Sequence, residues 1–102
     1  MPANVVLTGP RVPTVSAMST TTDRLARFET AQEMIGLLIA ARARALSDER
    51  GKSSPNGSAI AALLVEIDRF DDERDALRLD GFAEIERVIR EYGPTVKAAH
   101  AR

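Results

Sequence analysis

The residues best able to carry chemistry lie close together, in the acidic segment from Glu66 to Asp80. This segment contains seven acidic residues and three arginines, which gives it a net charge of −4. On a helix, side chains three and four positions apart share a face, and four aspartates meet that condition: Asp68, Asp71, Asp72 and Asp75. Carboxylates placed in this way could bind a divalent cation or act as an acid–base pair.

The rest of the composition argues against both kinds of site. Carboxylate-bridged metal centres in helical bundles add Glu-x-x-His pairs on two helices, and His100 is the only histidine among the 102 residues. The chain has no cysteine, which excludes disulfides, thiolate zinc sites and cysteine nucleophiles. We therefore predict no catalytic residue, no metal and no cofactor. The four aspartates then form a solvated face with ion pairs, or a docking surface for a basic partner.

The first element that the sequence predicts is a helix from about 21 to 50. Thr20 and Asp23 form an approximate capping box, and apolar residues then recur every three or four positions. Gly51 stands at the usual helix stop. The polar segment Lys52–Ser58 contains Pro and Asn-Gly, which predicts a turn with Ser58 as the N-cap of the next helix.

The second expected helix runs from about 59 to 92. Its apolar stripe crosses Asp80-Gly81 without a phase slip, which favours a continuous or kinked helix over a break at 80–81. Tyr92-Gly93-Pro94 is typical of a helix end, so 94–102 is predicted to be a C-terminal tail. Residues 1–19 hold three prolines and one charge, and predict a flexible or extended N-terminal arm, with Met18 as an alternative translation start.

The predicted fold class is therefore all-α: a long antiparallel helical hairpin, formed by residues 20–93, with an irregular N-terminal arm. A single seam between two helices gives a thin core for independent stability. The apolar face of the helices is wider than this one seam, so a second apolar surface remains that another element must cover. We expect a homodimer that forms a four-helix bundle; a partner protein, or a fold-back at Gly81 into a three-helix bundle, would also supply the cover. Arg42, which interrupts the apolar stripe, is expected to pair with Asp68 across the hairpin and fix its register.

The function expected from these features is that of a small non-enzymatic protein-interaction module: an inhibitor, an antitoxin or immunity-type protein, or a regulatory adaptor. It would act by steric occlusion, with a rigid helical face in a partner's groove. The candidate apolar anchors are Leu64, Phe70, Leu79, Phe82 and Ile89. The candidate rim, which would steer docking, consists of Asp68, Asp71, Asp72 and Asp75.

Two other classes of function remain open at this stage. The first is a dimeric nucleic-acid-binding or mobile-element accessory protein that uses Arg42, Arg44, Arg50 and Lys52, although no aromatic residues interleave this cluster. The second is a helical enzyme with an active site at a subunit interface. The longest apolar run, Met34–Ala41, is far shorter than the roughly 20 residues that cross a bilayer. We predict no membrane association and a cytoplasmic location.

Overall fold

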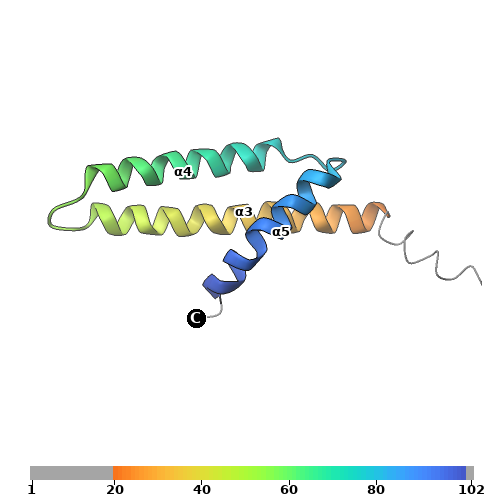
Figure 1. Ribbon diagram of the computed structural model, residues 1–102, viewed down its shortest axis with the longest axis horizontal. Helices are drawn as coiled ribbons and strands as arrows, with labels where there is room; N and C mark the ends of the chain where they lie inside the picture. The colour runs from red at the N-terminus through yellow and green to blue at the C-terminus, as the bar shows by residue number, and fades with distance from the viewer. Residues whose placement is uncertain (1–19, 101–102) are drawn as a thin grey trace, which may run out of the picture.

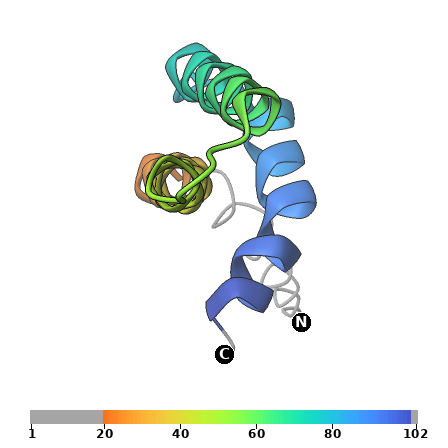
Figure 2. The ribbon, with the colours of Figure 1, turned by 90° about the vertical axis from the view of Figure 1, so that its left-hand side faces the viewer.

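The computed structural model describes residues 20–100, and within this part of the chain it is all-helical. The three helices are α3 (Thr21–Arg50), α4 (Gly57–Ala76) and α5 (Phe82–His100). In Figure 1, α3 and α4 run antiparallel side by side, and α5 crosses α3 obliquely. Figure 2 shows that α5 lies on one side of the α3–α4 pair. The expected arm of residues 1–19 lies outside the described residues.

Helix α3 begins and ends where the sequence predicts, because both ends are set by local groups. The Thr20 hydroxyl accepts a hydrogen bond from the Asp23 backbone N–H at 3.1 Å, as an N-cap does. At the other end the Gly51 N–H donates to the carbonyls of Ser47 and Asp48. The resulting 30-residue helix is the longest of the three and forms the base on which the other two pack.

The turn between α3 and α4 is capped by Asn56 and not by Ser58, so this detail of the sequence prediction is wrong. The Asn56 side-chain oxygen accepts from the N–H groups of Ser58 (2.9 Å) and Ala59 (3.1 Å). Helix α4 therefore starts at Gly57, two residues before the predicted start. The Asn56 N–H in turn donates to the Glu49 carboxylate at 2.9 Å, which ties the turn back to the end of α3.

The expected second helix, continuous over 59–92, is wrong, because the chain breaks between Ala76 and Phe82. Leu77 is extended, with φ −66° and ψ 138°, and its side chain is buried. A single helix over 57–100 would be about 66 Å long, against about 45 Å for α3. Its far end would have no partner within the chain. The break turns α5 back onto α3 and gives its apolar side a surface to cover.

The predicted helix end at Tyr92-Gly93-Pro94 is also wrong. Helix α5 continues through Pro94 to His100, so the segment expected to be a tail is largely helical. Proline inside a helix removes one backbone hydrogen bond and crowds the preceding turn. Packing opposes this cost, because Val96, in the turn after Pro94, lies against the core. Tertiary contact thus overrides a local stop signal.

The core lies where the three helices meet. Helix α3 contributes Ala31, Ile35 and Leu38. The other two helices and the link between them contribute the remaining buried side chains, Phe70, Leu77, Ile85 and Val88. Phe28, Ile39, Ile89, Tyr92 and Val96 are partly buried around this cluster. The fold is therefore a three-helix junction with a two-helix arm. The arm consists of the second half of α3 and the first half of α4, which project from the junction side by side (Figure 1).

Candidate interaction surface

The outward side of α4 brings exposed apolar and acidic side chains together. Val65 is 66% exposed and Leu64 is 41% exposed. The exposed Asp68 follows them at helical spacings of four and three residues, so it is their neighbour on the helix surface. Asp72 and Asp75 continue the same face and are also exposed. We call Leu64, Val65, Asp68, Asp72 and Asp75 the α4 face.

The three aspartates of the α4 face have no internal counter-ion. Within the described residues, no hydrogen bond or ion pair joins these carboxylates to another side chain. Two arginines on α4 are engaged elsewhere: Arg69 pairs with Glu73 at 3.0 Å, and Arg74 pairs with Asp71 at 2.8 Å. Asp71, the fourth aspartate of the predicted rim, is thus neutralised within α4. The remaining negative charges are free to attract a positively charged surface.

The predicted anchors Leu79, Phe82 and Ile89 do not adjoin the α4 face. Leu79 and Phe82 lie in and just after the link to α5, at the end of the molecule away from the turn, and are 40% and 46% exposed. Ile89 is half-buried and packs against the core. On one continuous helix these positions would follow Leu64 along a common side. The break redirects α5, so the single surface expected from the sequence becomes two.

The second exposed patch surrounds the start of α3. Its exposed apolar members are Leu79 and Phe82, and the Arg24 guanidinium lies 4.5 Å from the centre of the Phe82 ring. A hollow of about 470 Å³ opens beside them, lined by Thr21, Arg24, Phe28, Leu77, Arg78, Leu79 and Asp80. Arginine over an aromatic face is a favourable contact, so part of the exposed Phe82 ring is already covered.

Phe70 is not available as a surface anchor, which corrects the sequence-based assignment. Its side chain is only 4% exposed and belongs to the core cluster. The ring meets Tyr92 edge to face, with the ring centres 5.7 Å apart. Arg69 and Arg42 cover its other sides at 4.6 and 5.8 Å from the ring centre. Phe70 is buried because α5 folds back over α4.

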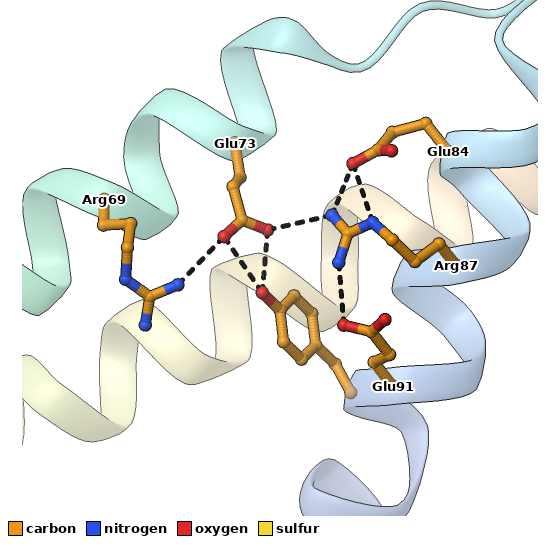
Figure 3. Close-up of polar contacts among 6 residues, drawn as sticks. Arg69, Glu73, Glu84, Arg87 and Glu91 are labelled. Carbon is orange, nitrogen blue, oxygen red and sulfur yellow. Dashed lines mark hydrogen bonds and ion pairs between the residues drawn. The ribbon is translucent and has the colours of Figure 1, made fainter.

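A polar network centred on Glu73 holds α5 against α4 (Figure 3). The Tyr92 hydroxyl donates to the two Glu73 carboxylate oxygens, at 2.8 and 3.0 Å. Arg87 reaches the same carboxylate at 3.4 Å, and also pairs with Glu84 and Glu91 on its own helix. Glu73 therefore accepts from both helices, through Arg69 on α4 and through Tyr92 and Arg87 on α5.

The contacts in this network raise the pKa of a tyrosine and lower the pKa of a glutamate. Burial is the largest influence on Tyr92 and raises the pKa of its hydroxyl, and the bonded Glu73 carboxylate raises it further. Hydrogen bonds from Arg87 lower the pKa of the Glu84 carboxyl. The hydrogen bond from Arg27 likewise lowers the pKa of Glu86, at the contact between α3 and α5. Neutral tyrosine and ionised glutamates are thus the forms that the fold stabilises.

Arg42 pairs with Glu66, at 2.5 Å between Nε and Oε1, and not with Asp68. The expectation that Arg42 joins the two helices is met, but its partner is wrong by two residues. Two residues correspond to more than half a helical turn, so Asp68 points away from α3 while Glu66 faces it. The shift follows from the turn, where α4 starts at Gly57.

The basic cluster considered for nucleic acid is partly neutralised. Arg42 is paired with Glu66, and Lys52 with Glu49 at 2.8 Å. Arg44 and Arg50 remain exposed on the last two turns of α3. Two arginines give a weak electrostatic footprint, because each phosphate contact contributes separately to affinity.

The described residues hold no group of three or more His, Cys, Asp or Glu side chains that could bind a metal ion. Among the helices over 20–100, none has both the length and the apolar character needed to span a membrane. Comparisons with protein-family models, with curated proteins and with solved structures found no significant match. The geometry of this chain must therefore carry any functional argument.

The sequence did not predict a role for two exposed apolar residues, Val65 and Leu25, or the polar network centred on Glu73. Among the large apolar side chains of the described residues, Val65 has the largest exposed fraction, and Leu25 is also exposed. Val65 could have been found from its position beside Asp68 and Asp72 on a helical wheel. Leu25 and the Glu73–Tyr92 contact had no such signal, because both depend on where α5 lies.

Proposed function

We propose that this protein is a small non-enzymatic interaction module that binds a partner protein through the α4 face. The observation that carries the proposal is the pairing of exposed Leu64 and Val65 with aspartates that lack an internal counter-ion. Apolar side chains supply the contact area of an interface, and surrounding charge orients and accelerates docking. The fitting partner is a protein with an apolar site bordered by lysine or arginine.

The mechanism is occlusion by a rigid helix. Helix α4 is anchored at one end by Phe70 and the Glu73 network, and at the other by the Asn56 cap. An α-helix held in this way presents its face with little loss of conformational entropy on binding. A partner surface covered by α4 is then closed to other ligands, which is how an inhibitor, an immunity-type protein or an adaptor would act.

The decisive experiment compares capture by the native protein with capture by two sets of variants. The test variants are Leu64→Ser with Val65→Ser, and Asp68→Lys with Asp72→Lys and Asp75→Lys. The matched control reverses exposed acids on α3, Glu29→Lys with Asp48→Lys. Proteins taken from the native host by the native chain and the control, and lost with both test sets, would support the proposal. Equal capture by all variants would contradict it.

Binding kinetics with the purified partner then separate the roles of the two residue types. Reversal of the three aspartates should lower the association rate by tenfold or more at low salt, with a smaller effect at high salt. Truncation of Leu64 and Val65 should mainly raise the dissociation rate. An association rate that does not depend on salt would remove the steering role of the aspartates.

We also propose self-association as a homodimer, in which two copies place α3 and α4 side by side as a four-helix bundle. The support is a hollow of about 620 Å³ along these helices, lined by Gln32, Glu33, Gly36, Leu37, Arg74, Asp75 and Leu77. Gly36 has no side chain to fill this hollow, and only the Arg74 guanidinium reaches over it. Light scattering over a concentration series measures the oligomeric state. A monomer at every concentration would rule the dimer out.

A nucleic-acid-binding accessory role is the alternative class, and the two exposed arginines at the end of α3 are its remaining support. A mobility-shift titration with duplex DNA over a range of salt concentrations tests it directly. Binding at low salt that weakens with Arg44→Ala and Arg50→Ala would favour it. Absence of binding at low salt would exclude it.

A further inference from the structure

The break between α4 and α5 interrupts the backbone helix but not the apolar pattern. Leu63, Phe70 and Leu77 recur at seven-residue intervals; Ile85 follows after eight residues and Val88 after a further three. On a straight helix these positions would all lie on one side. Phe70, Leu77, Ile85 and Val88, which fill the core of the folded chain, would therefore also lie on the apolar stripe of a single joined helix.

The backbone of the link contains no conformation that only the bent form can hold. No described residue has a positive φ, and this includes Gly81. The link is closed by a turn in which the Gly81 N–H donates to the Arg78 carbonyl at 2.9 Å. A Cβ added at Gly81 would be in van der Waals contact with that carbonyl oxygen, at 3.4 Å. Rotation of Leu77 from extended to helical would join the two helices.

The contacts that hold α5 do not require α5 to belong to the same chain. On α3 they include the pair Arg27–Glu86 and the packing of Phe82 against Arg24. On α4 they include Tyr92 and Arg87 on Glu73, and Tyr92 on Phe70. An α5 from a second copy could make every one of these contacts. Only the link would differ between the two arrangements.

We propose that two copies of this chain exchange α5. In the exchanged dimer, residues 77–81 become helical, α4 and α5 form one long helix, and each α5 packs on the α3 and α4 of the other copy. Exchange of an identical element is an economical route to a dimer, because the native interface is reused. This proposal does not use the α4 face.

Substitutions in the link should move the balance between the two forms in opposite directions. Gly81→Ala with Asp80→Ala raises the helix propensity of the link in both copies. We expect it to lower the dimer dissociation constant by roughly tenfold or more. Leu79→Pro is the opposite variant: residue 79 is the second residue of the Arg78–Gly81 turn, where proline is favoured, while proline inside a joined helix is not. It should not form the exchanged dimer at any concentration.

Cross-linking identifies which chain supplies α5, and the absence of native cysteine makes it selective. One copy carries Arg27→Cys and the other Glu86→Cys, at the exposed α3–α5 pair. The two are unfolded, mixed, refolded and treated with a short bis-maleimide. A link between residue 27 of one chain and residue 86 of the other, found by mass spectrometry in the isolated dimer and lost with Leu79→Pro, is the expected result.

Three results would overturn the proposal. One is a monomer at every concentration in both the native chain and the Gly81→Ala, Asp80→Ala variant. Another is a dimer in which no 27–86 link joins different chains. The third is a 27–86 link between different chains that persists unchanged with Leu79→Pro, which would show that the link region does not control the exchange.

Discussion

The three-helix junction and the two-helix arm are built from similar residues but differ in what covers them. Of the eight buried apolar residues in the part of the chain that the structure describes, seven belong to the junction cluster and the eighth, Leu46, lies in the arm. Leu64 and Val65, in the arm, remain exposed because no third helix reaches them. The comparison shows that α5 decides which apolar side chains stabilise the fold and which stay available for a partner.

The largest expected difference concerns truncation of the two cores. Phe70→Ala, in the junction, should lower the free energy of unfolding by about 3–5 kcal/mol, because it leaves a cavity under all three helices and removes the contact with Tyr92. Leu46→Ala, in the arm, should cost about 2 kcal/mol, since two helices can close over the gap. Urea unfolding of both variants measures the difference. Equal losses would show that the arm is as tightly packed as the junction.

The next effect concerns the part of α5 beyond Pro94, at the edge of the junction. Pro94→Ala restores a backbone hydrogen bond and should raise the free energy of unfolding by about 1–3 kcal/mol. Thr95→Ala, at the exposed next position, is the matched control and should change it by less than about 1 kcal/mol. Denaturation of both variants, with helix content followed by circular dichroism, provides the measurement. A Pro94→Ala variant no more stable than the control would mean that this turn adds nothing to the junction.

In the arm, loss of the Asn56 cap at the turn should have a smaller effect than loss of Leu46. Asn56→Ala removes the oxygen that accepts from Ser58 and Ala59, and should cost about 1 kcal/mol. Hydrogen exchange should show faster opening of the first turn of α4, with the junction amides little affected. Ser58→Ala is the control, because Ser58 contributes only its backbone to the cap. Comparable losses in the two variants would contradict the assignment of Asn56 as the cap.

The smallest expected effect is an alkaline weakening of the junction through Tyr92. Its pKa is raised in the folded chain, so the stabilisation is fully present below the unfolded value of about 10 and is lost as pH rises through the folded value. Tyr92 is the only tyrosine, so its ionisation can be followed by tyrosinate absorbance. Tyr92→Phe should cost up to about 1 kcal/mol at neutral pH and should abolish the alkaline decline. A normal titration of Tyr92 would show that its contact with Glu73 is not maintained in solution.

Features set by neighbouring residues were predictable, and features set by distant ones were not. The bounds of α3 and the position of the turn follow from Thr20, Gly51 and the Pro-Asn-Gly segment, whose effects act within a few residues. The pairing of Arg42 across the turn was predictable in kind, but its partner depended on where α4 begins. The exposed rim aspartates were identified correctly as a group on one helix, whereas Asp71 is neutralised by Arg74 and Phe70 is buried by α5.

The sequence by itself determined that the chain forms amphipathic helices and that the first helix ends near Gly51. It also determined that the chain offers no cysteine and only one histidine for chemistry. Periodicity and capping are local, and each needs only the residues within one or two helical turns. The tertiary structure alone decided that the second helix breaks before Gly81 and that the third continues through Pro94. Both choices go against the local signal, because burial of Leu77, Ile85, Val88 and Val96 on α3 and α4 outweighs an unbroken phase and a proline stop.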